Sequence, residues 1–288
     1  MPVRLTDVVL RDGLQDLDGV VSTATKLELA RALVAAGVSE LEVAAFVSPR
    51  KVPQMGDGPE VLQGLKDLVT TRICAIALNG RGIQRARESR LDELRLVVSA
   101  ANGHSQANAG RSPGELIEQY AVELHAAPVQ FEVTGAVSVA FNCPFDGPVE
   151  PARAVSVVRA LVDLGATRVA LADTLGTAPT SQVMETVTAV QEACPGLPLG
   201  LHLHDGHGQA LTTVKAAITA GVDQFDSALG GLGGCPFAPG AHGNLNTADL
   251  VVALDADGVE TGIDATGLAE AQVVLRRAMW EAGVTAAR

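Results

Sequence analysis

The chain has 288 residues, of which 47% are hydrophobic and only 3% aromatic, and its formal net charge is −12. This length allows a large domain whose core must be built from aliphatic side chains. The acidic charge argues against nucleic-acid binding, because proteins bind phosphate backbones through basic surfaces.

The sequence also bears on location. No apolar run approaches the roughly 18 residues that a membrane-spanning helix needs. The first residues lack the basic and apolar segments of a signal peptide. The four cysteines form no CxxC pair, which fits reduced thiols better than a disulfide framework or a zinc site. We therefore expect a cytoplasmic protein that does not contact membranes.

Short apolar runs alternate with longer amphipathic runs along the whole chain. The predicted strands are Val3–Leu10, Leu41–Phe46, Ile73–Leu78, Leu94–Ser99, Val129–Val139, Arg168–Asp173, Leu197–His204 and Val222–Ser227. The helices predicted between them include Thr23–Ala36, Pro113–His125, Ala152–Leu164, Ser181–Ala193 and Gln209–Ala220.

This alternation predicts an α/β fold, a TIM (β/α)₈ barrel in a single domain over residues 1–288. The barrel is expected at about residues 3–260. A further C-terminal helix, at about residues 261–287, would pack on the barrel or on a neighbouring subunit. A doubly wound open sheet is the alternative, but its glycine-rich phosphate turn after the first strand is missing.

In a TIM barrel the active site lies where the strands end. Polar residues that fall at or near such ends are Arg11, Asp12, Glu42, Asp173, His202 and His204. None of them was used to define the strands, so their agreement with the rule supports both the fold and the site.

The pair His202 and His204 points toward a metal. Two residues that lie two apart on a strand face the same side of the sheet. A shared metal is the usual reason for such a pair, and a hydrogen-bonded surface pair is the alternative. Adding Asp12 and Asn244 gives a mixed nitrogen and oxygen set, which suits Mg²⁺ or Mn²⁺ better than a closed zinc site. We expect Asp205 to cap the following helix rather than to bind the metal.

Three further charged residues each allow two interpretations. Arg11 beside Asp12 is either a surface ion pair or an oxyanion stabiliser next to a metal ligand and base. Glu42 lies in an apolar run, so its carboxylate is either part of a strand-end salt bridge or an active-site group. Asp173 is either a turn residue or an active-site group.

Residues 230–243, GGLGGCPFAPGAHG, contain six glycines and cannot form a regular helix or strand. Active-site lids have this composition, and a plain connector is the alternative. Cys235 lies within this loop, where an exposed thiol could take part in acid–base or redox chemistry.

Six motifs together resemble the 3-hydroxy-3-methylglutaryl-CoA (HMG-CoA) lyase family of barrel-fold metallolyases. They are RDGLQ (11–15), VSTATK (21–26), FVSPRKVPQMGD (46–57), ADTLG (172–176), HLHDGHGQA (202–210) and GLGGCPFAPGAHGN (231–244). The resemblance implies a divalent cation, Mg²⁺ or Mn²⁺, held by Asp12, His202, His204 and Asn244. It also implies that Arg11, Asp12, Glu42, Asp173, His202 and Cys235 act in catalysis.

The implied reaction is the cleavage of a 3-hydroxyacyl-CoA thioester, with HMG-CoA giving acetyl-CoA and acetoacetate. The residues expected to bind the CoA part are Gln15, Ser48, Arg50 and Lys51. The alternatives are a related 3-hydroxyacyl-CoA lyase, an aldolase or condensing synthase of the same superfamily, and a catalytically silent barrel. We expect the protein to form a homo-oligomer, a dimer or larger.

Two segments depart from the family pattern. Asp16-Leu17-Asp18 follows RDGLQ where the family typically has Asn-Glu-Lys, and Ala101-Asn102 replaces a Ser-Glu pair. These changes bear on the acyl or CoA part of the substrate rather than on the metal.

Overall fold

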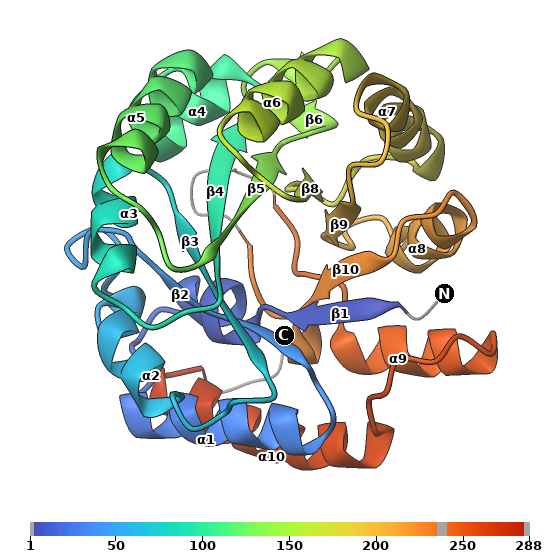
Figure 1. Cartoon of the computed structure of the whole chain (residues 1–288). Coiled ribbons are helices and arrows are strands. Elements are labelled where there is room, and N and C mark those ends of the chain that lie inside the picture. The colour runs from blue at the N-terminus through green and yellow to red at the C-terminus, as the bar shows by residue number, and fades with distance from the viewer. Residues whose placement is uncertain (1–2, 235–240, 285–288) are drawn as a thin grey trace.

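The computed structural model describes residues 3–234 and 241–284, and Figure 1 shows a barrel of strands ringed by helices. Eight parallel strands pair in the closed order β1-β10-β9-β8-β5-β4-β3-β2. Their bounds are β1 Arg4–Asp7, β2 Glu40–Ala45, β3 Arg72–Ala77, β4 Glu93–Ser99, β5 Glu132–Ser138, β8 Val169–Asp173, β9 Leu199–Leu203 and β10 Gln224–Ser227. The TIM barrel is therefore confirmed, and each predicted strand overlaps one of these eight.

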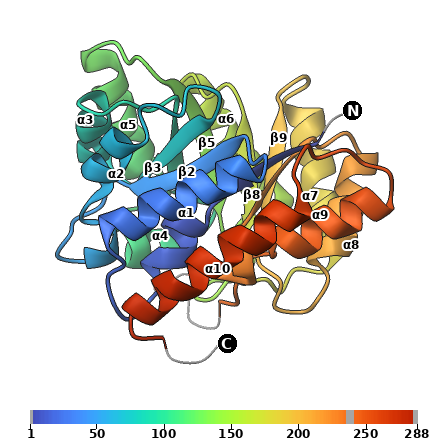
Figure 2. The ribbon, with the colours of Figure 1, turned by 90° about the horizontal axis from the view of Figure 1, so that it is seen from below.

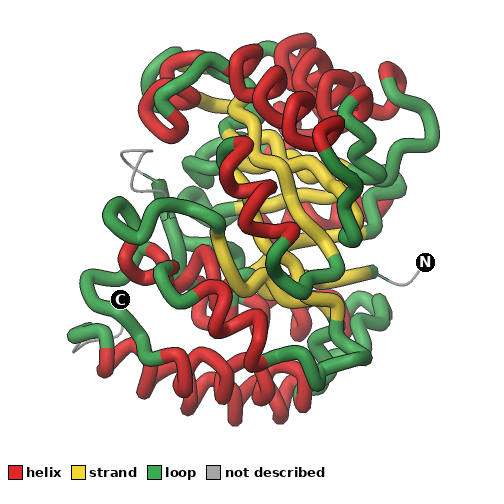
Figure 3. The backbone as a smooth tube through the Cα atoms, turned by 60° about the vertical axis from the view of Figure 1, so that its left-hand side comes forward, coloured by secondary structure: helices red, strands yellow, loops and turns green. Residues whose placement is uncertain are grey.

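The helices surround the strands, as the tube in Figure 3 shows. Their bounds are α1 Thr23–Ala35, α2 Gly58–Gly64, α3 Gly80–Arg87, α4 Asn102–Ala109, α5 Pro113–Ala126, α6 Pro151–Asp163, α7 Thr180–Ala193, α8 Ala210–Thr219, α9 Thr247–Ala256 and α10 Ala265–Glu281. A short hairpin, β6 Asn142–Cys143 with β7 Gly147–Pro148, follows β5. No helix in the described part of the chain is long and apolar enough to cross a membrane.

The C-terminal helix was predicted at about residues 261–287. Within the described residues it is α10, which packs against α1 and α9 of the same chain (Figure 2). It therefore packs on the ring of helices around the barrel, the first of the two predicted positions. Its start is fixed by Asp264, whose carboxylate accepts hydrogen bonds from the backbone N–H groups of Thr266 and Gly267.

The predicted strand Val3–Leu10 is wrong at its carboxyl end. The strand stops at Asp7, and a single π-helical turn, η1, covers Val9–Gly13. Asp7 causes the change, because its buried carboxylate accepts a hydrogen bond from the backbone N–H of Val9 at 2.8 Å. The apolar side chains of η1 are buried like those of a strand, so the hydrophobic pattern alone does not separate the two.

The inside of the barrel is polar at the amino-terminal ends of its strands. Glu93 of β4 is the centre of this layer and has no exposed surface. Its carboxylate accepts hydrogen bonds from Arg72 at 3.0 Å, Arg95 at 2.9 Å and Thr134 at 2.7 Å, and it also pairs with Arg168. Burial opposes ionisation, but the arginines outweigh it and hold the pKa of Glu93 below its usual value.

Candidate metal centre and active site

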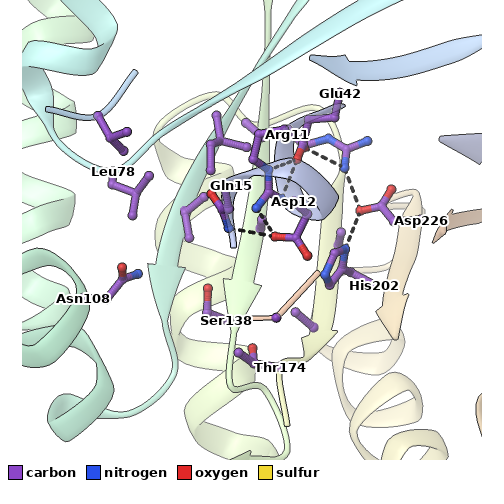
Figure 4. Close-up of a pocket in the computed structure, with 18 of the residues that line it drawn as sticks. Arg11, Asp12, Gln15, Glu42, Leu78, Asn108, Ser138, Thr174, His202 and Asp226 are labelled. Carbon is purple, nitrogen blue, oxygen red and sulfur yellow. Dashed lines mark hydrogen bonds and ion pairs between the residues drawn. The ribbon is translucent and has the colours of Figure 1, made fainter. Parts of the chain in front are cut away.

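A cavity of about 120 Å³ lies at the carboxyl ends of the strands (Figure 4). Six of the sequence-predicted site residues line it: Arg11, Asp12, Gln15, Glu42, His202 and His204. The opposite wall is apolar, with Val47, Val52, Ile76, Leu78 and Val97. The strand-end rule therefore predicts part of the polar wall, namely Arg11, Asp12, Glu42, His202 and His204.

The π-helical turn η1 points Arg11 and Asp12 into the cavity. Asp7 fixes this turn from below, because its second carboxylate oxygen accepts hydrogen bonds from Thr247 at 2.7 Å and from the backbone of Leu229 at 3.0 Å. Burial raises the pKa of Asp7 to about 6, although these hydrogen bonds oppose the shift. A π-helical turn at a functional site is a common arrangement.

His202 and His204 meet with their Nε2 atoms 3.1 Å apart. The Nδ1 of His202 donates to Asp226 at 3.2 Å, and the Nδ1 of His204 donates to the carbonyl of His242 at 2.5 Å. These bonds leave both Nε2 atoms directed toward Asp12, and the Oδ2 of Asp12 lies 3.8 Å from the Nε2 of His204. An imidazole that binds a metal through one ring nitrogen typically donates a hydrogen bond through the other, as the Nδ1 atoms do here.

Asn244 completes the cluster because its segment pairs with the end of β9. The N–H of Leu245 donates to the carbonyl of Leu203 at 2.9 Å, which sets Asn244 opposite His204. Its amide nitrogen donates to Asp12 at 2.6 Å, while its buried Oδ1 accepts no hydrogen bond from the described residues. An unsatisfied buried oxygen beside a carboxylate and two imidazoles fits a divalent cation such as Mg²⁺ or Mn²⁺.

Gly233 packs directly against this cluster. A Cβ atom there would lie 2.2 Å from the amide nitrogen of Asn244 and 2.7 Å from a carboxylate oxygen of Asp12, and its φ is +119°. Both the space and the backbone conformation therefore require glycine. Part of the glycine-rich composition of the loop is explained by this close approach.

Arg11 is held between two carboxylates. Its Nε donates to Glu42 at 2.5 Å, and its Nη1 pairs with Asp12. Burial opposes its charge, but the two carboxylates outweigh burial and raise the pKa of Arg11 above its usual value. Glu42 is thus a partner in a buried salt bridge, and the guanidinium that it holds lines the cavity.

The pKa values of the two imidazoles are shifted in opposite directions. Burial opposes protonation of His202, but its hydrogen bond to Asp226 and the charge of Asp12 raise its pKa. Burial and the neighbouring charge of His202 lower the pKa of His204 to about 4. The surroundings therefore favour protonation of His202 more than protonation of His204.

Asp173 takes the turn position that was the alternative to an active-site role. Its carboxylate accepts hydrogen bonds from the backbone N–H groups of Gly176 at 3.1 Å and Ala178 at 2.9 Å, and it is not among the residues that line the cavity. Burial raises its pKa, although these hydrogen bonds oppose the shift. Asp205 similarly accepts from the N–H of Ala210, the first residue of α8, although the residue directly before that helix is Gln209.

The residues expected to bind CoA are only partly brought together. Gln15 lines the cavity and donates to Asp12 at 3.1 Å. Ser48, Arg50 and Lys51 are exposed on the loop after β2, outside the lining of the cavity. Their role in binding CoA stays a prediction. Cys235 lies outside the described residues.

Sequence reasoning missed Arg95 and Asp226, which lie inside the barrel next to the site. Arg95 stands between two apolar residues, in Leu94-Arg95-Leu96, and Asp226 follows the apolar Phe225. This period of two was the available signal, since it places both side chains on one face of a strand. Other missed lining residues are Ser138, Thr174, His104 and Asn108; the first two could have been found by applying the strand-end rule to β5 and β8.

Comparison with known proteins agrees with this geometry. The HMGL-like family model matches residues 2–275. The (R)-citramalyl-CoA lyase of Chloroflexus aurantiacus is 39% identical, covering 92% of this chain and 87% of the relative. A 3-hydroxy-3-isohexenylglutaryl-CoA/hydroxymethylglutaryl-CoA lyase of Pseudomonas aeruginosa is 37% identical, covering 93% of this chain and 90% of the relative.

A solved structure extends this comparison to the fold. The HMG-CoA lyase of Acinetobacter baumannii, in complex with coenzyme A and 3-methylmalate, superimposes with a TM-score of 0.93 at 35% identity, covering 97% of this chain and 92% of that one. The resemblance predicted from the six motifs is confirmed. The chain therefore belongs to the HMGL-like family and is a carbon–carbon lyase.

Proposed function

We propose that the protein catalyses the metal-dependent retro-Claisen cleavage of a 3-hydroxyacyl-CoA thioester, with HMG-CoA as the first candidate substrate. The observation that carries this proposal is the convergence of Asp12, His202, His204 and Asn244 beside the guanidinium of Arg11. A related lyase named for HMG-CoA and a neighbouring structure in complex with coenzyme A support the substrate class.

The four convergent residues would hold Mg²⁺ or Mn²⁺ through one carboxylate, two imidazoles and one amide oxygen. When bound, the cation would polarise the hydroxyl and carbonyl oxygens of the substrate and lower the pKa of the hydroxyl. Asp12 is suited to accept the hydroxyl proton. Burial opposes its ionisation, but Arg11 and the two histidines outweigh burial and lower its pKa, which keeps the carboxylate in the ionised form that can take a proton, although as a weak base.

Cleavage then moves the electron pair of the carbon–carbon bond onto the thioester as an enolate. Arg11 stabilises the enolate oxygen, because its guanidinium is held in place by Glu42 and stays charged. The enolate carbon takes a proton from His202 or from Cys235, the two donors predicted from the sequence. For HMG-CoA the products are acetyl-CoA and acetoacetate.

Citramalyl-CoA is the second candidate substrate, because a relative named for it is 39% identical to this chain. The same bond cleavage would give acetyl-CoA and pyruvate. The two substrates share a tertiary hydroxyl and a carboxylate, so the polar wall of the cavity suits both.

The test is incubation of the purified protein and Mn²⁺ with a panel of 3-hydroxyacyl-CoA thioesters, with product identification by mass spectrometry. We expect acetyl-CoA with acetoacetate from HMG-CoA, or with pyruvate from citramalyl-CoA, and no product after chelation. His204→Ala is the matched negative control. Absence of acetyl-CoA from every thioester would overturn the proposal and favour an aldolase, a synthase or a silent barrel.

We also propose, from the sequence, a homo-oligomer located in the cytoplasm. Light scattering after size-exclusion chromatography tests the assembly, and a monomer at micromolar concentration would contradict it.

A further inference from the structure

Arg95 is the most buried cation near the active site, with 4% of its surface exposed. It projects from β4 into the barrel, between the charged layer below and the cavity above. All three of its guanidinium nitrogens donate to the protein: Nε to Glu93 at 2.9 Å, Nη2 to Thr6 at 3.2 Å, and Nη1 to Asp226 at 2.7 Å. A guanidinium engaged on every nitrogen is suited to hold other groups in place.

The Nη1 atom of Arg95 also lies 3.3 Å from the Oε2 of Glu42. One nitrogen thus meets two carboxylates that belong to different parts of the site. Glu42 accepts from Arg11 at 2.5 Å through its other oxygen, and Asp226 accepts from His202 at 3.2 Å. Figure 4 shows Glu42 and Arg11 on one side of this junction and Asp226 and His202 on the other.

The five side chains therefore form a continuous chain of contacts, in the order Arg11, Glu42, Arg95, Asp226 and His202, in which each carboxylate lies between two nitrogen donors. The two carboxylates are almost completely removed from solvent, so each depends on the cations beside it. Among the described residues, loss of the central guanidinium would leave Glu42 paired with Arg11 and Asp226 paired with the imidazole of His202. Each carboxylate would then be free to move toward the partner that remains.

We propose that Arg95 is a positioning residue that fixes Arg11 and His202 relative to each other through Glu42 and Asp226, an inference that rests on the proposed function of this site. Arg95 need not touch the substrate. It acts by setting where the oxyanion stabiliser and the metal-binding imidazole lie, and a displacement of about 1 Å in such groups can cost about 100-fold in rate.

Arg72 offers a matched control. Like Arg95, it is an arginine that donates to Glu93, but its other partner is Glu132, and neither Glu42 nor Asp226 contacts it within the described residues. Arg72→Met and Arg95→Met both remove a cation from Glu93. Only Arg95→Met separates the two carboxylates of the active site.

The experiment measures Mn²⁺ affinity by calorimetry, together with kcat and KM for the thioester identified above. We expect Arg95→Met to weaken Mn²⁺ binding by about 10–100-fold, as loss of a residue behind a metal ligand does. We expect kcat to fall about 100-fold with KM within about threefold, because the lost effect is one of geometry. Arg95→Lys should recover only part of both losses, since an ammonium lacks the planar fork. Arg72→Met should change each quantity by less than about threefold.

If Arg95→Met does not fold, a double-mutant cycle of Glu42→Gln and Asp226→Asn tests the same link. Because both carboxylates share one nitrogen, their effects on kcat should be non-additive by about fivefold or more. Additive effects, wild-type Mn²⁺ affinity in a folded Arg95→Met, or equal losses in Arg72→Met would overturn the inference. Calorimetry needs no substrate, so a protein that cleaves none of the thioesters would refute the proposed function while still testing Arg95.

Discussion

Glu93→Gln tests how strongly the charged layer inside the barrel stabilises the fold. Glu93 has no exposed surface and contacts three arginines and Thr134. Breaking a buried ion pair by removing one partner costs about 3–5 kcal/mol. The glutamine carbonyl can still accept one hydrogen bond, which recovers about 1 kcal/mol. We therefore expect the free energy of unfolding to fall by about 2–4 kcal/mol.

The measurement is urea unfolding followed by circular dichroism, with Glu132→Gln as the control. Glu132 and its partner Arg72 leave 34% and 30% of their side chains exposed, so their pair should contribute at most about 1 kcal/mol. The pKa of Glu93 is lowered, so its contribution is present above pH 4.5 and is lost as the pH falls below that value. A loss below about 1 kcal/mol at pH 7, equal to that of Glu132→Gln, would refute the reasoning.

Three further predictions concern the site and its wall. Gly233→Ala should weaken Mn²⁺ binding at least about 10-fold, because the new Cβ would collide with Asn244. Gly165→Ala should leave the affinity unchanged, because Gly165 also has a positive φ but no atom lies within 4 Å of its new Cβ. Equal Mn²⁺ affinities of the two variants in calorimetry would contradict this prediction. Arg11→Gln should lower kcat by at least about 10²–10³-fold while leaving Mn²⁺ affinity within about threefold, and near-normal turnover would remove Arg11 from the mechanism. Burial lowers the pKa of His104 to about 4, so the free energy of unfolding should fall by about 3 kcal/mol as the pH drops from 6.5 to 4. His104→Phe should lack this loss when unfolding is measured across the same pH range. A pH profile of stability that is the same in His104→Phe and in the wild type would contradict the prediction.

The barrel could be predicted because its signal is repeated. Most strands are short apolar runs and most helices are amphipathic, so errors at single boundaries do not change the fold. The boundary error at Leu10 has a local cause that the pattern does not carry. The carboxylate of Asp7 is satisfied by the backbone of Val9 and by Thr247, which is 240 residues away in sequence. Only tertiary contacts distinguish this aspartate from an exposed one at a strand end.

Only part of the site could be predicted from the sequence. The strand-end rule applies to residues at the rim, and it found His202, His204 and Asp12. It does not apply to Arg95 and Asp226, which lie deeper in the barrel. An isolated charge in a strand normally suggests a solvent-exposed face. The partners that stabilise Arg95 inside the barrel come from three other strands, and the sequence pattern does not predict which residues pair.

The cavity has a polar wall and an apolar wall, and the two departures from the family pattern fall outside the polar wall. Asp16 lies beside Gly234 of the glycine-rich loop, and Asp18 is exposed. Asn102 is exposed at the start of α4, whose later residues His104 and Asn108 line the cavity. We therefore expect substitutions at the rim and on α4 to change which acyl group the protein accepts without disturbing the proposed metal ligands. Relatives named for citramalyl-CoA and for HMG-CoA are 39% and 37% identical to this chain, so overall identity does not decide between the two acyl groups.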